Sequence, residues 1–233
     1  MTEQKKLTRL TGWLYLVVIV CAGFSQGAVR ESVLVTGDAL TTAQNILASE
    51  TLFRWGLITD LIAFSTDIAI SVLLYLLLSS VNKPLALIMA AFRLIAHPAI
   101  ASMNLLNHYA ALKVLQDPEL ASQFSPERLY EASLFFMEAH HMGYLIAGVV
   151  FGIHCAILGY LLVRSGAFPK LLGALLMLAS VGYLTESFGF MLYPEYKAIF
   201  AWIVGISAGI GEVGLCLWFI VSSYRRQEWR VES

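Results

Sequence analysis

The sequence predicts an all-α membrane protein: a polytopic bundle of six transmembrane helices that forms one integral membrane domain over residues 1–233. Three observations lead to this fold class. Hydrophobic residues make up 58% of the chain, and the mean hydropathy is +0.73. Charged residues make up only 13%, whereas a soluble domain carries about 25%. Apolar stretches long enough to cross ~30 Å of hydrocarbon recur along the chain and leave no room for a separate soluble domain.

The first two spans flank a long polar segment. Residues 10–29 form an apolar run that extends well past the hydrophobic region of a signal peptide, so we interpret them as the first membrane helix. The segment Arg30–Trp55 is long enough to hold a short helix, and the hydroxyl groups of Thr41 and Thr42 are suited to cap its start. The second span then covers residues 56–80.

Two prolines mark the third and fourth spans. The third span covers residues 85–112 and contains Pro98, which removes a backbone hydrogen bond and predicts a kink. After it, Ser125 and Pro126 start an apolar helix of the kind that lies at a membrane interface. This helix leads into the fourth span, residues 140–163.

The fifth and sixth spans follow short turns. The turn Arg164–Lys170 precedes the fifth span at residues 171–192, and the sixth span covers residues 198–222. Spans four and six both carry small residues four positions apart, the pattern that lets membrane helices approach closely. We therefore expect helix packing at Gly148, Gly152, Gly205 and Gly209.

The distribution of basic residues predicts that both termini are cytoplasmic. An even number of spans places both termini on one side, and that side carries nine of the 15 Lys and Arg residues. The opposite side carries five, and Arg93 lies inside a span. Because Lys and Arg favour cytoplasmic loops, we expect a multi-pass protein of the cytoplasmic (inner) membrane with this orientation.

Ten ionisable side chains interrupt the predicted spans, which is not typical of a passive anchor. A charge in hydrocarbon costs roughly 2.5–3.5 kcal/mol on insertion scales, so such residues usually face a partner or a watery cavity. The ten are Asp60, Asp67, Arg93, His97, Glu138, His140, His141, His154, Glu186 and Glu212.

Helical spacing aligns several of these residues. Asp60 and Asp67 are seven residues apart, so they share one face of the second span about 10 Å apart along its axis. His140 and His154 are fourteen residues apart and share a face of the fourth span within about 40°. The third span carries a continuous stripe with offsets of four, seven and four residues: Arg93, His97, Asn104 and His108.

We expect these residues to form one buried polar cluster that opens outward. Arg93 is the predicted main counter-charge to a carboxylate of the second or sixth span. Histidines, protons or a metal must balance the remaining acids. The candidate members are Asp60, Asp67, Arg93, Asn104, Glu138, His140, His154, Glu186 and Glu212.

Several segments resemble a known family. They are Asn45–Arg54, Ile58–Ile62 and Val81–Ala86 in the first half, and Tyr144–Gly148, Phe151–His154, Leu158–Leu162 and Arg164–Lys170 in the second. These segments are similar to bacterial membrane proteins grouped as domain of unknown function 4386 (DUF4386), and the match covers almost the whole chain. The resemblance implies a small multi-pass protein without an assigned activity, so it implies no substrate.

The resemblance also bears on individual positions. His97 and His108 look like departures from the family, which tends to be apolar or small at these two positions. The family usually carries matching polar types at the positions of Asp60, Arg93, Asn104, His140, His154, Glu186 and Glu212.

Four classes of function remain open, and the sequence does not decide whether the protein is an enzyme. A membrane-embedded metal-dependent hydrolase would bind zinc through imidazole and carboxylate groups. However, His140 and His154 lie about 21 Å apart along the helix axis, and no H-E-x-x-H motif is present. A proton-coupled transporter would use buried acids and histidines as a proton relay. No inverted repeat is evident, so a homodimer would have to supply a second half.

The two other classes are a haem protein and a structural or regulatory membrane protein. Two haems would require His140 and His154 on the fourth span, completed by His97 and His108 on the third. The sequence specifies no metal, haem or other cofactor. The expected partner is the lipid bilayer, with room for a homo-oligomer, and the net charge of −1 gives no argument for nucleic acid.

Overall fold

The structure is a computed structural model that describes residues 3–224, with side chains up to Ser222. The described residues contain helices and no strands, which confirms the predicted all-α fold class. The basic tail residues Arg225, Arg226 and Arg230, used in the orientation argument, lie outside the described residues.

The elements are α1 (Glu3–Gly23), η1 (Phe24–Arg30), α2 (Glu31–Val33), α3 (Ala39–Ala48), α4 (Glu50–Leu78), α5 (Lys83–Leu94), η2 (Ile95–Ala101), α6 (Ser102–Gln116), α7 (Pro118–Gln123), α8 (Pro126–Arg164), α9 (Lys170–Leu192), η3 (Pro194–Tyr196) and α10 (Lys197–Tyr224).

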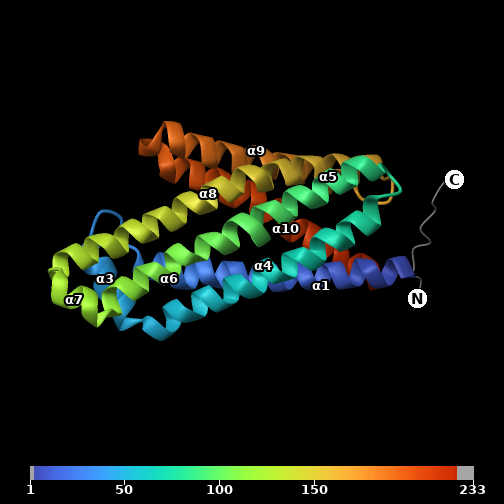
Figure 1. Cartoon of the computed structure of the whole chain (residues 1–233). Coiled ribbons are helices and arrows are strands. Elements are labelled where there is room, and N and C mark those ends of the chain that lie inside the picture. The colour runs from blue at the N-terminus through green and yellow to red at the C-terminus, as the bar shows by residue number, and fades with distance from the viewer. Residues whose placement is uncertain (1–2, 225–233) are drawn as a thin grey trace.

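Six helical stretches among the described residues are long and apolar enough to cross a membrane, so the chain is a multi-pass membrane protein. They run side by side as a bundle (Figure 1), in which α8 packs along α9, α9 along α10, and α1 against both α4 and α10. The two ends of the described chain lie at the same end of the bundle, whereas α3 and α7 cover the other end, here called the α7 end. The six stretches are Glu3–Val33, Glu50–Leu78, Lys83–Gln116, Pro126–Arg164, Lys170–Leu192 and Pro194–Ser222.

The helices are longer than the predicted spans, and the largest difference concerns the first and fourth. The first helix does not end at residue 29 but continues through η1 to Val33. The predicted interfacial helix and fourth span form one uninterrupted helix, α8, which begins with Pro126 at its first turn. Short α3 is present as expected, but its start is capped by the Asp38 carboxylate, which accepts from the Thr41 N–H at 2.9 Å.

Two of the transmembrane stretches contain a seven-residue π-helical segment, η1 in the first and η2 in the third. Pro98 lies inside η2, so the missing N–H of proline is absorbed by a local change of helix type around the expected kink. Such π segments occur frequently at functional sites in helical proteins.

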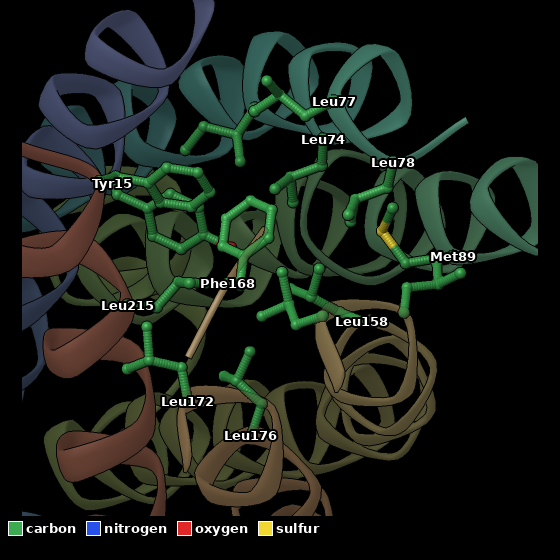
Figure 2. Packing of buried hydrophobic residues seen from close by; sticks show 14 of the residues in the cluster. Tyr15, Leu74, Leu77, Leu78, Met89, Leu158, Phe168, Leu172, Leu176 and Leu215 are labelled. Atoms are coloured by element: carbon green, nitrogen blue, oxygen red, sulfur yellow. The ribbon is translucent and has the colours of Figure 1, made fainter. Parts of the chain in front are cut away.

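The largest apolar cluster joins residues of α4, α5, α8, α9 and α10 (Figure 2). Leu74 and Leu78 from α4 pack there with Leu158 from α8 and Leu215 from α10. Within lipid, tight packing rather than exclusion of water holds helices together. A Cβ atom added at Gly159 would lie only 2.5 Å from the Gly173 carbonyl oxygen, so α8 and α9 approach here backbone to backbone.

The expected glycine contacts are present on α8 but not on α10. A Cβ atom added at Gly148 would meet the Ser187 hydroxyl at 3.0 Å, and one at Gly152 would meet the Tyr183 Cβ at 3.2 Å, both on α9. Gly205 and Gly209 face open space, with no atom within 4 Å of an added Cβ. The packing prediction is wrong for these two because α10 contacts α9 through the opposite face, which carries Val204, Ser207 and Ala208.

Candidate functional site

Helix α4 carries the two completely buried aspartates of the described chain, Asp60 and Asp67. Each carboxylate pairs with an arginine from a different helix: Asp60 with Arg30, and Asp67 with Arg93. The two ion pairs are the centres of two separate polar groups, which are described in turn.

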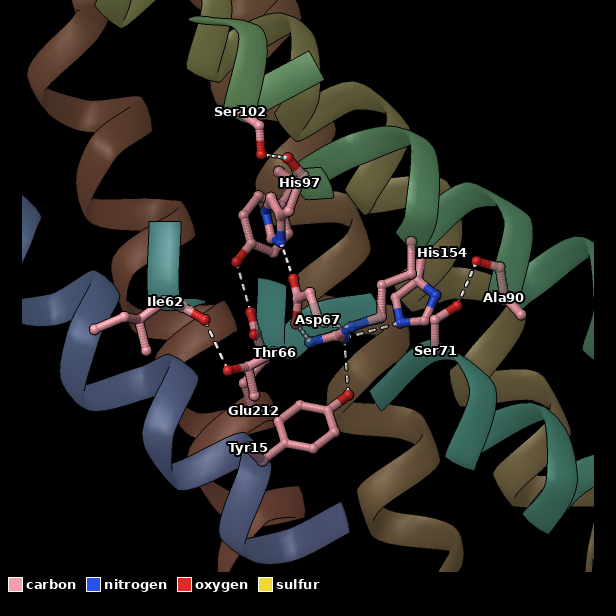
Figure 3. Close-up of polar contacts among 12 residues, drawn as sticks. Tyr15, Ile62, Thr66, Asp67, Ser71, Ala90, His97, Ser102, His154 and Glu212 are labelled. Carbon is pink, nitrogen blue, oxygen red and sulfur yellow. Dashed lines mark hydrogen bonds and ion pairs between the residues drawn. The ribbon is translucent and has the colours of Figure 1, made fainter. Parts of the chain in front are cut away.

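The first group surrounds Asp67 (Figure 3). Its Oδ1 atom accepts hydrogen bonds from Nε of Arg93 at 3.1 Å and from Nη2 at 2.5 Å. Its Oδ2 atom accepts from Nδ1 of His97 at 2.5 Å. Arg93 is therefore the counter-charge of Asp67 on the second span, and it does not pair with Glu212 on the sixth.

Arg93 is itself fully buried and surrounded by partners. Its Nη1 atom donates to the Tyr15 hydroxyl at 2.9 Å and lies 3.3 Å from Nε2 of His154. The guanidinium carbon lies 4.7 Å from the centre of the Tyr15 ring and 5.2 Å from that of Phe151, which is typical of cation–π contacts. We call Tyr15, Asp67, Arg93, His97 and His154 the central cluster.

The hydrogen-bond partners of His154 assign its protonation. Arg93 can only donate, so Nε2 of His154 accepts, and Nδ1 must carry the hydrogen. Nδ1 then donates to the Met89 carbonyl oxygen at 2.9 Å. In this arrangement His154 is neutral and both ring nitrogens are occupied, which leaves neither free to bind a metal or haem iron.

His97 lies at the edge of the central cluster. Its side chain is 20% exposed, and its ring stacks on Phe151 at 4.4 Å and Phe64 at 5.7 Å between centres. Nδ1 donates to Asp67, whereas Nε2 has no hydrogen-bond partner among the described residues.

A further carboxylate lies beside the central cluster. Glu212 of α10 accepts a hydrogen bond from the Tyr183 hydroxyl of α9 at 2.5 Å. The Tyr183 ring packs edge-on against Phe151, with 5.2 Å between ring centres. Glu212 is thus connected to the central cluster through the rings of Tyr183 and Phe151, without a direct ion pair in the described residues.

The second group surrounds Asp60, nearer the α7 end. Nη1 of Arg30 donates to Oδ2 of Asp60 at 2.6 Å. The guanidinium also donates to the Gln26 side chain at 3.0 Å and to the Tyr144 hydroxyl at 3.4 Å, and it lies 5.1 Å from the centre of the Tyr144 ring. Arg30 is buried because the first helix continues through η1, which carries position 30 into the bundle.

Two histidines and an asparagine complete the second group. His140 lies between His108 and Tyr144, with ring-centre distances of 5.6 and 5.1 Å. Asn104 donates to the His140 carbonyl oxygen at 2.7 Å, and His108 donates from Nε2 to the Phe53 carbonyl oxygen at 2.9 Å. We call this set the distal cluster: Arg30, Asp60, Asn104, His108, His140 and Tyr144.

Phe64 separates the two clusters. It lies on α4 between Asp60 and Asp67, is buried, and packs with Ala63, Ala101, Leu105 and Ala147. Its ring centre lies 5.7 Å from that of His97 in the central cluster and 6.2 Å from that of Tyr144 in the distal cluster. A packed apolar layer therefore divides the residues that we expected to form one cluster.

Besides Glu212, two more predicted members lie outside both clusters. Glu138 is exposed, because the helix rotation of about 100° per residue turns it away from the buried Met137 and His140. Glu186 is half-buried on α9, which packs mainly between α8 and α10, and it has no ion pair or hydrogen bond among the described residues. Neither acid belongs to a buried polar group.

One surface hollow is not lined by cluster residues, so it is not the outward-opening cavity that we expected. This hollow of about 620 Å³ lies at the α7 end between α6, α7 and α8. Its lining is largely apolar and includes Leu120, Phe124 and Phe135. The distal cluster lies deeper, under packed side chains.

Six residues of the site were not among the nine candidate members from the sequence. Two of them, His97 and His108, were placed on the polar stripe of the third span but not in the candidate cluster. Arg30 was assigned to the polar segment after the first span, although its spacing of four from Gln26 is compatible with a continuing helix. Tyr15, Tyr144 and Tyr183 were counted with the apolar residues, and their hydroxyl groups make the contacts to Arg93, Arg30 and Glu212.

The arrangement does not suit a metal or haem centre. Among the described residues, no group of three His, Cys, Asp or Glu side chains is placed to hold a metal ion. Of the histidines that haem ligation would require, His154 has both ring nitrogens engaged, by Arg93 and by the Met89 carbonyl oxygen. What the clusters contain is buried carboxylates, fixed cations and titratable imidazoles, which are groups that bind and transfer protons.

Comparison with known proteins identifies the family. The sequence profile described as domain of unknown function (DUF4386) matches residues 10–222. The chain belongs to the DUF4386 family. The DUF4386 match includes both buried ion pairs and leaves out only the two ends of the chain.

One relative gives a second comparison. An uncharacterized protein of the archaeon Archaeoglobus fulgidus is 27% identical over 162 residues, which is 70% of this DUF4386 chain and 80% of the relative. No solved structure matches the chain significantly. Because this relative is archaeal, the bacterial origin expected from the sequence stays a prediction.

Proposed function

We propose that this DUF4386 protein is a proton-coupled transporter, in which Asp67 binds the coupling proton and His97 delivers it. One observation carries the proposal: a fully buried carboxylate is shared between a permanent cation, Arg93, and a titratable base, His97. Acids and histidines placed in this way inside membrane helices form the proton relays of pumps and transporters.

The ion pair supplies a physical reason for coupling. A proton on Asp67 removes the negative charge that neutralises Arg93, and a buried guanidinium without a counter-charge costs several kcal/mol. Proton binding is therefore unfavourable unless the helices rearrange. Both partners of Asp67 lie on the third transmembrane stretch, Arg93 near the end of α5 and His97 in η2. The expected movement is a displacement of this stretch relative to α4.

The π-helical segment η2 supports such a movement. It begins two residues after Arg93, contains His97 itself, and includes Pro98. Helix interruptions of this type mark positions where a helix changes geometry at low cost. A change in η2 would alter the position of His97 while α4, which has no such interruption, stays in place.

Reconstituted protein allows a direct test. Proteoliposomes adsorbed on a solid-supported membrane report charge movement when the bathing solution is stepped from about pH 7.5 to about pH 5.5, across the ordinary pKa of histidine. We expect a transient current that depends on the amount of protein. Asp67→Asn should remove most of it, whereas Asp117→Asn, on the loop before α7, should leave it unchanged.

A second variant, His97→Gln, tests the proposal even if Asp67→Asn does not fold. His97→Gln retains a hydrogen-bond donor for Asp67 but cannot titrate, and the partly exposed position tolerates it better. The expected result is a parent-like melting temperature with a strongly reduced current. Currents equal to those of protein-free vesicles, or unchanged in His97→Gln, would leave only a structural role for the central cluster.

The proposal includes a location and orientation: the cytoplasmic membrane, with both termini in the cytoplasm. Cysteines introduced at the exposed positions Gln44 and Lys83 lie at opposite ends of the bundle. In intact cells, a membrane-impermeant maleimide should label Gln44→Cys, and Lys83→Cys only after permeabilisation. The parent, which retains Cys21, Cys155 and Cys216, is the control. The reverse pattern would invert the orientation.

A further inference from the structure

The distal cluster contains three buried polar atoms without hydrogen-bond partners among the described residues. They are Oδ1 of Asp60, Nδ1 of His108 and Nε2 of His140. All three side chains are at least 99% buried, and their residues lie within one connected set of contacts around Arg30 and Tyr144. Buried polar groups in native proteins are nearly always satisfied, so three together in one place require an explanation.

His108 contributes an acceptor. Its Nε2 atom lies 2.9 Å from the Phe53 carbonyl oxygen, which can only accept, so Nε2 carries the hydrogen. In the neutral ring Nδ1 is then a bare acceptor. The imidazole stacks on Phe53 with 3.9 Å between ring centres, which fixes its plane and prevents Nδ1 from turning toward another partner.

His140 contributes a second acceptor by the same reasoning. Its Nδ1 atom lies 3.2 Å from the Asn104 backbone carbonyl oxygen, closer than the 3.3 Å to the Asn104 side-chain nitrogen. That side-chain nitrogen already donates to the His140 carbonyl oxygen at 2.7 Å. We assign the ring hydrogen of His140 to Nδ1, directed at the nearer Asn104 carbonyl oxygen, which leaves Nε2 to accept.

The cluster thus has more acceptors than donors. The third unpaired atom, Oδ1 of Asp60, can only accept while the carboxylate is ionised. The Tyr144 hydroxyl accepts from Arg30 and can donate its single hydrogen to one of the three atoms. At least two acceptors then lack a donor.

Charge selects the kind of molecule that supplies the missing hydrogens. Asp60 is already neutralised by Arg30 at 2.6 Å, so a bound cation would leave an uncompensated charge in the membrane. A neutral molecule with two donor hydrogens avoids this cost. Water has two such hydrogens, which match the two acceptors that remain when Tyr144 donates to Oδ1 of Asp60, and two polar partners are within the range typical of buried water.

We propose that the distal cluster is a binding site for a single water molecule, which donates to His108 and His140 while the Tyr144 hydroxyl donates to Oδ1 of Asp60. The ligand class is a neutral hydrogen-bond donor of the size of water, because aromatic rings and helix backbones enclose the site. This inference concerns the Asp60 ion pair and does not depend on the transport function proposed for Asp67.

Solid-state NMR of the full chain in lipid bilayers tests the proposal without any substitution. The protein is labelled with 15N-histidine, and polarisation is transferred from water protons to the unprotonated ring nitrogens. We expect transfer to Nδ1 of His108 and Nε2 of His140. His154 is the internal control, because its accepting Nε2 is already engaged by Arg93, so we expect no transfer there. Tyr144→Phe should weaken both distal signals.

Three outcomes would overturn the inference. The first is an absence of transfer to His108 and His140. The second is equal transfer to all three histidines, which would indicate general penetration of water instead of a built site. The third is a hydrogen on Nε2 of His140, because the ring would then supply a donor itself and the shortage of donors would disappear.

Discussion

The central and distal clusters are built from the same parts but differ in how completely they are satisfied. Each consists of an aspartate of α4, an arginine from another helix, a tyrosine and histidines. In the central cluster both Asp67 oxygens and both His154 nitrogens have partners. In the distal cluster Asp60, His108 and His140 each retain an unpaired buried atom.

This difference separates two roles for buried charge. A completely bonded network fixes one packing arrangement, and the loss of one member leaves an unpaired charge. A partly bonded network has capacity left for a bound molecule. Both arginines also adjoin π-helical segments, Arg30 as the last residue of η1 and Arg93 just before η2. Each cluster therefore has its own irregular segment, and Phe64 lies between them.

The largest expected effect is the loss of Arg93. Arg93→Met leaves the Asp67 carboxylate buried with only His97 as a partner, and it should reduce the free energy of unfolding by about 3–5 kcal/mol. Unfolding in mixed detergent micelles measures this change. Arg54→Met is the control, since Arg54 is exposed and pairs only at the surface. A change within about 0.5 kcal/mol, as expected for a surface position, would show that the central cluster is not the stabilising one.

The next effect concerns the layer between the clusters. Phe64→Ala should cost about 3 kcal/mol, at the lower end for deletion of a buried phenylalanine, since lipid adds no hydrophobic driving force. It should also open a polar connection, so that polarisation transfer from water reaches His97. The conservative Phe64→Leu should keep the layer closed. If water reaches His97 equally in Phe64→Ala and the parent, the two clusters are not separated by this side chain.

A smaller effect is expected for the distal arginine. Arg30→Met removes one ion pair and the bond to the exposed Gln26, and we expect a loss of about 2–3 kcal/mol, typical of hydrogen bonds to charged groups. The informative result is that Arg30→Met loses less unfolding free energy than Arg93→Met when both variants are measured under the same conditions. If Arg30→Met lost more unfolding free energy than Arg93→Met, the distal cluster and not the central one would be the more stabilising of the two.

The smallest effect lies outside the membrane, at the cap of α3. Hydrogen bonds from the backbone N–H and the hydroxyl of Thr41 lower the pKa of Asp38 below its ordinary value. A carboxylate with a lowered pKa stabilises the fold above its unfolded pKa of about 3.9, and the contribution is lost as the pH falls through the folded value. Hydrogen exchange of the α3 amides should therefore speed up in acid in the parent, and Asp38→Asn should remove this pH dependence. If the pH dependence of exchange were unchanged in Asp38→Asn, it would arise from the buried clusters and not from this cap.

The six-helix fold could be predicted from the sequence because span length and apolar composition are properties of each segment alone. The depth of the polar residues also follows from residue spacing along each helix. Asp60 and Asp67 were expected about 10 Å apart along their helix, and His140 and His154 about 21 Å apart. The structure places the first residue of each pair in the distal cluster and the second in the central cluster.

The partners of these residues could not be predicted in the same way, because they depend on helix rotation and on where helices end. Arg30 enters the bundle only because η1 extends the first helix, and a π-helical segment has no simple sequence signature. Gly205 and Gly209 follow a contact pattern but face away from α9, since α10 uses its other face. The separation into two clusters depends on an apolar residue, Phe64, and a search of the sequence for ionisable residues does not find it.

The independence of the two clusters is the central claim, and a double-mutant cycle on two mild variants tests it most directly. Tyr15→Phe removes a hydrogen bond to Arg93, and Tyr144→Phe removes one to Arg30. Sites without shared partners are additive to within about 0.5 kcal/mol, so the double variant should lose the sum of the two single losses in unfolding free energy. A coupling energy of about 1 kcal/mol or more would mean that the clusters form one network, and the two-cluster account would be wrong.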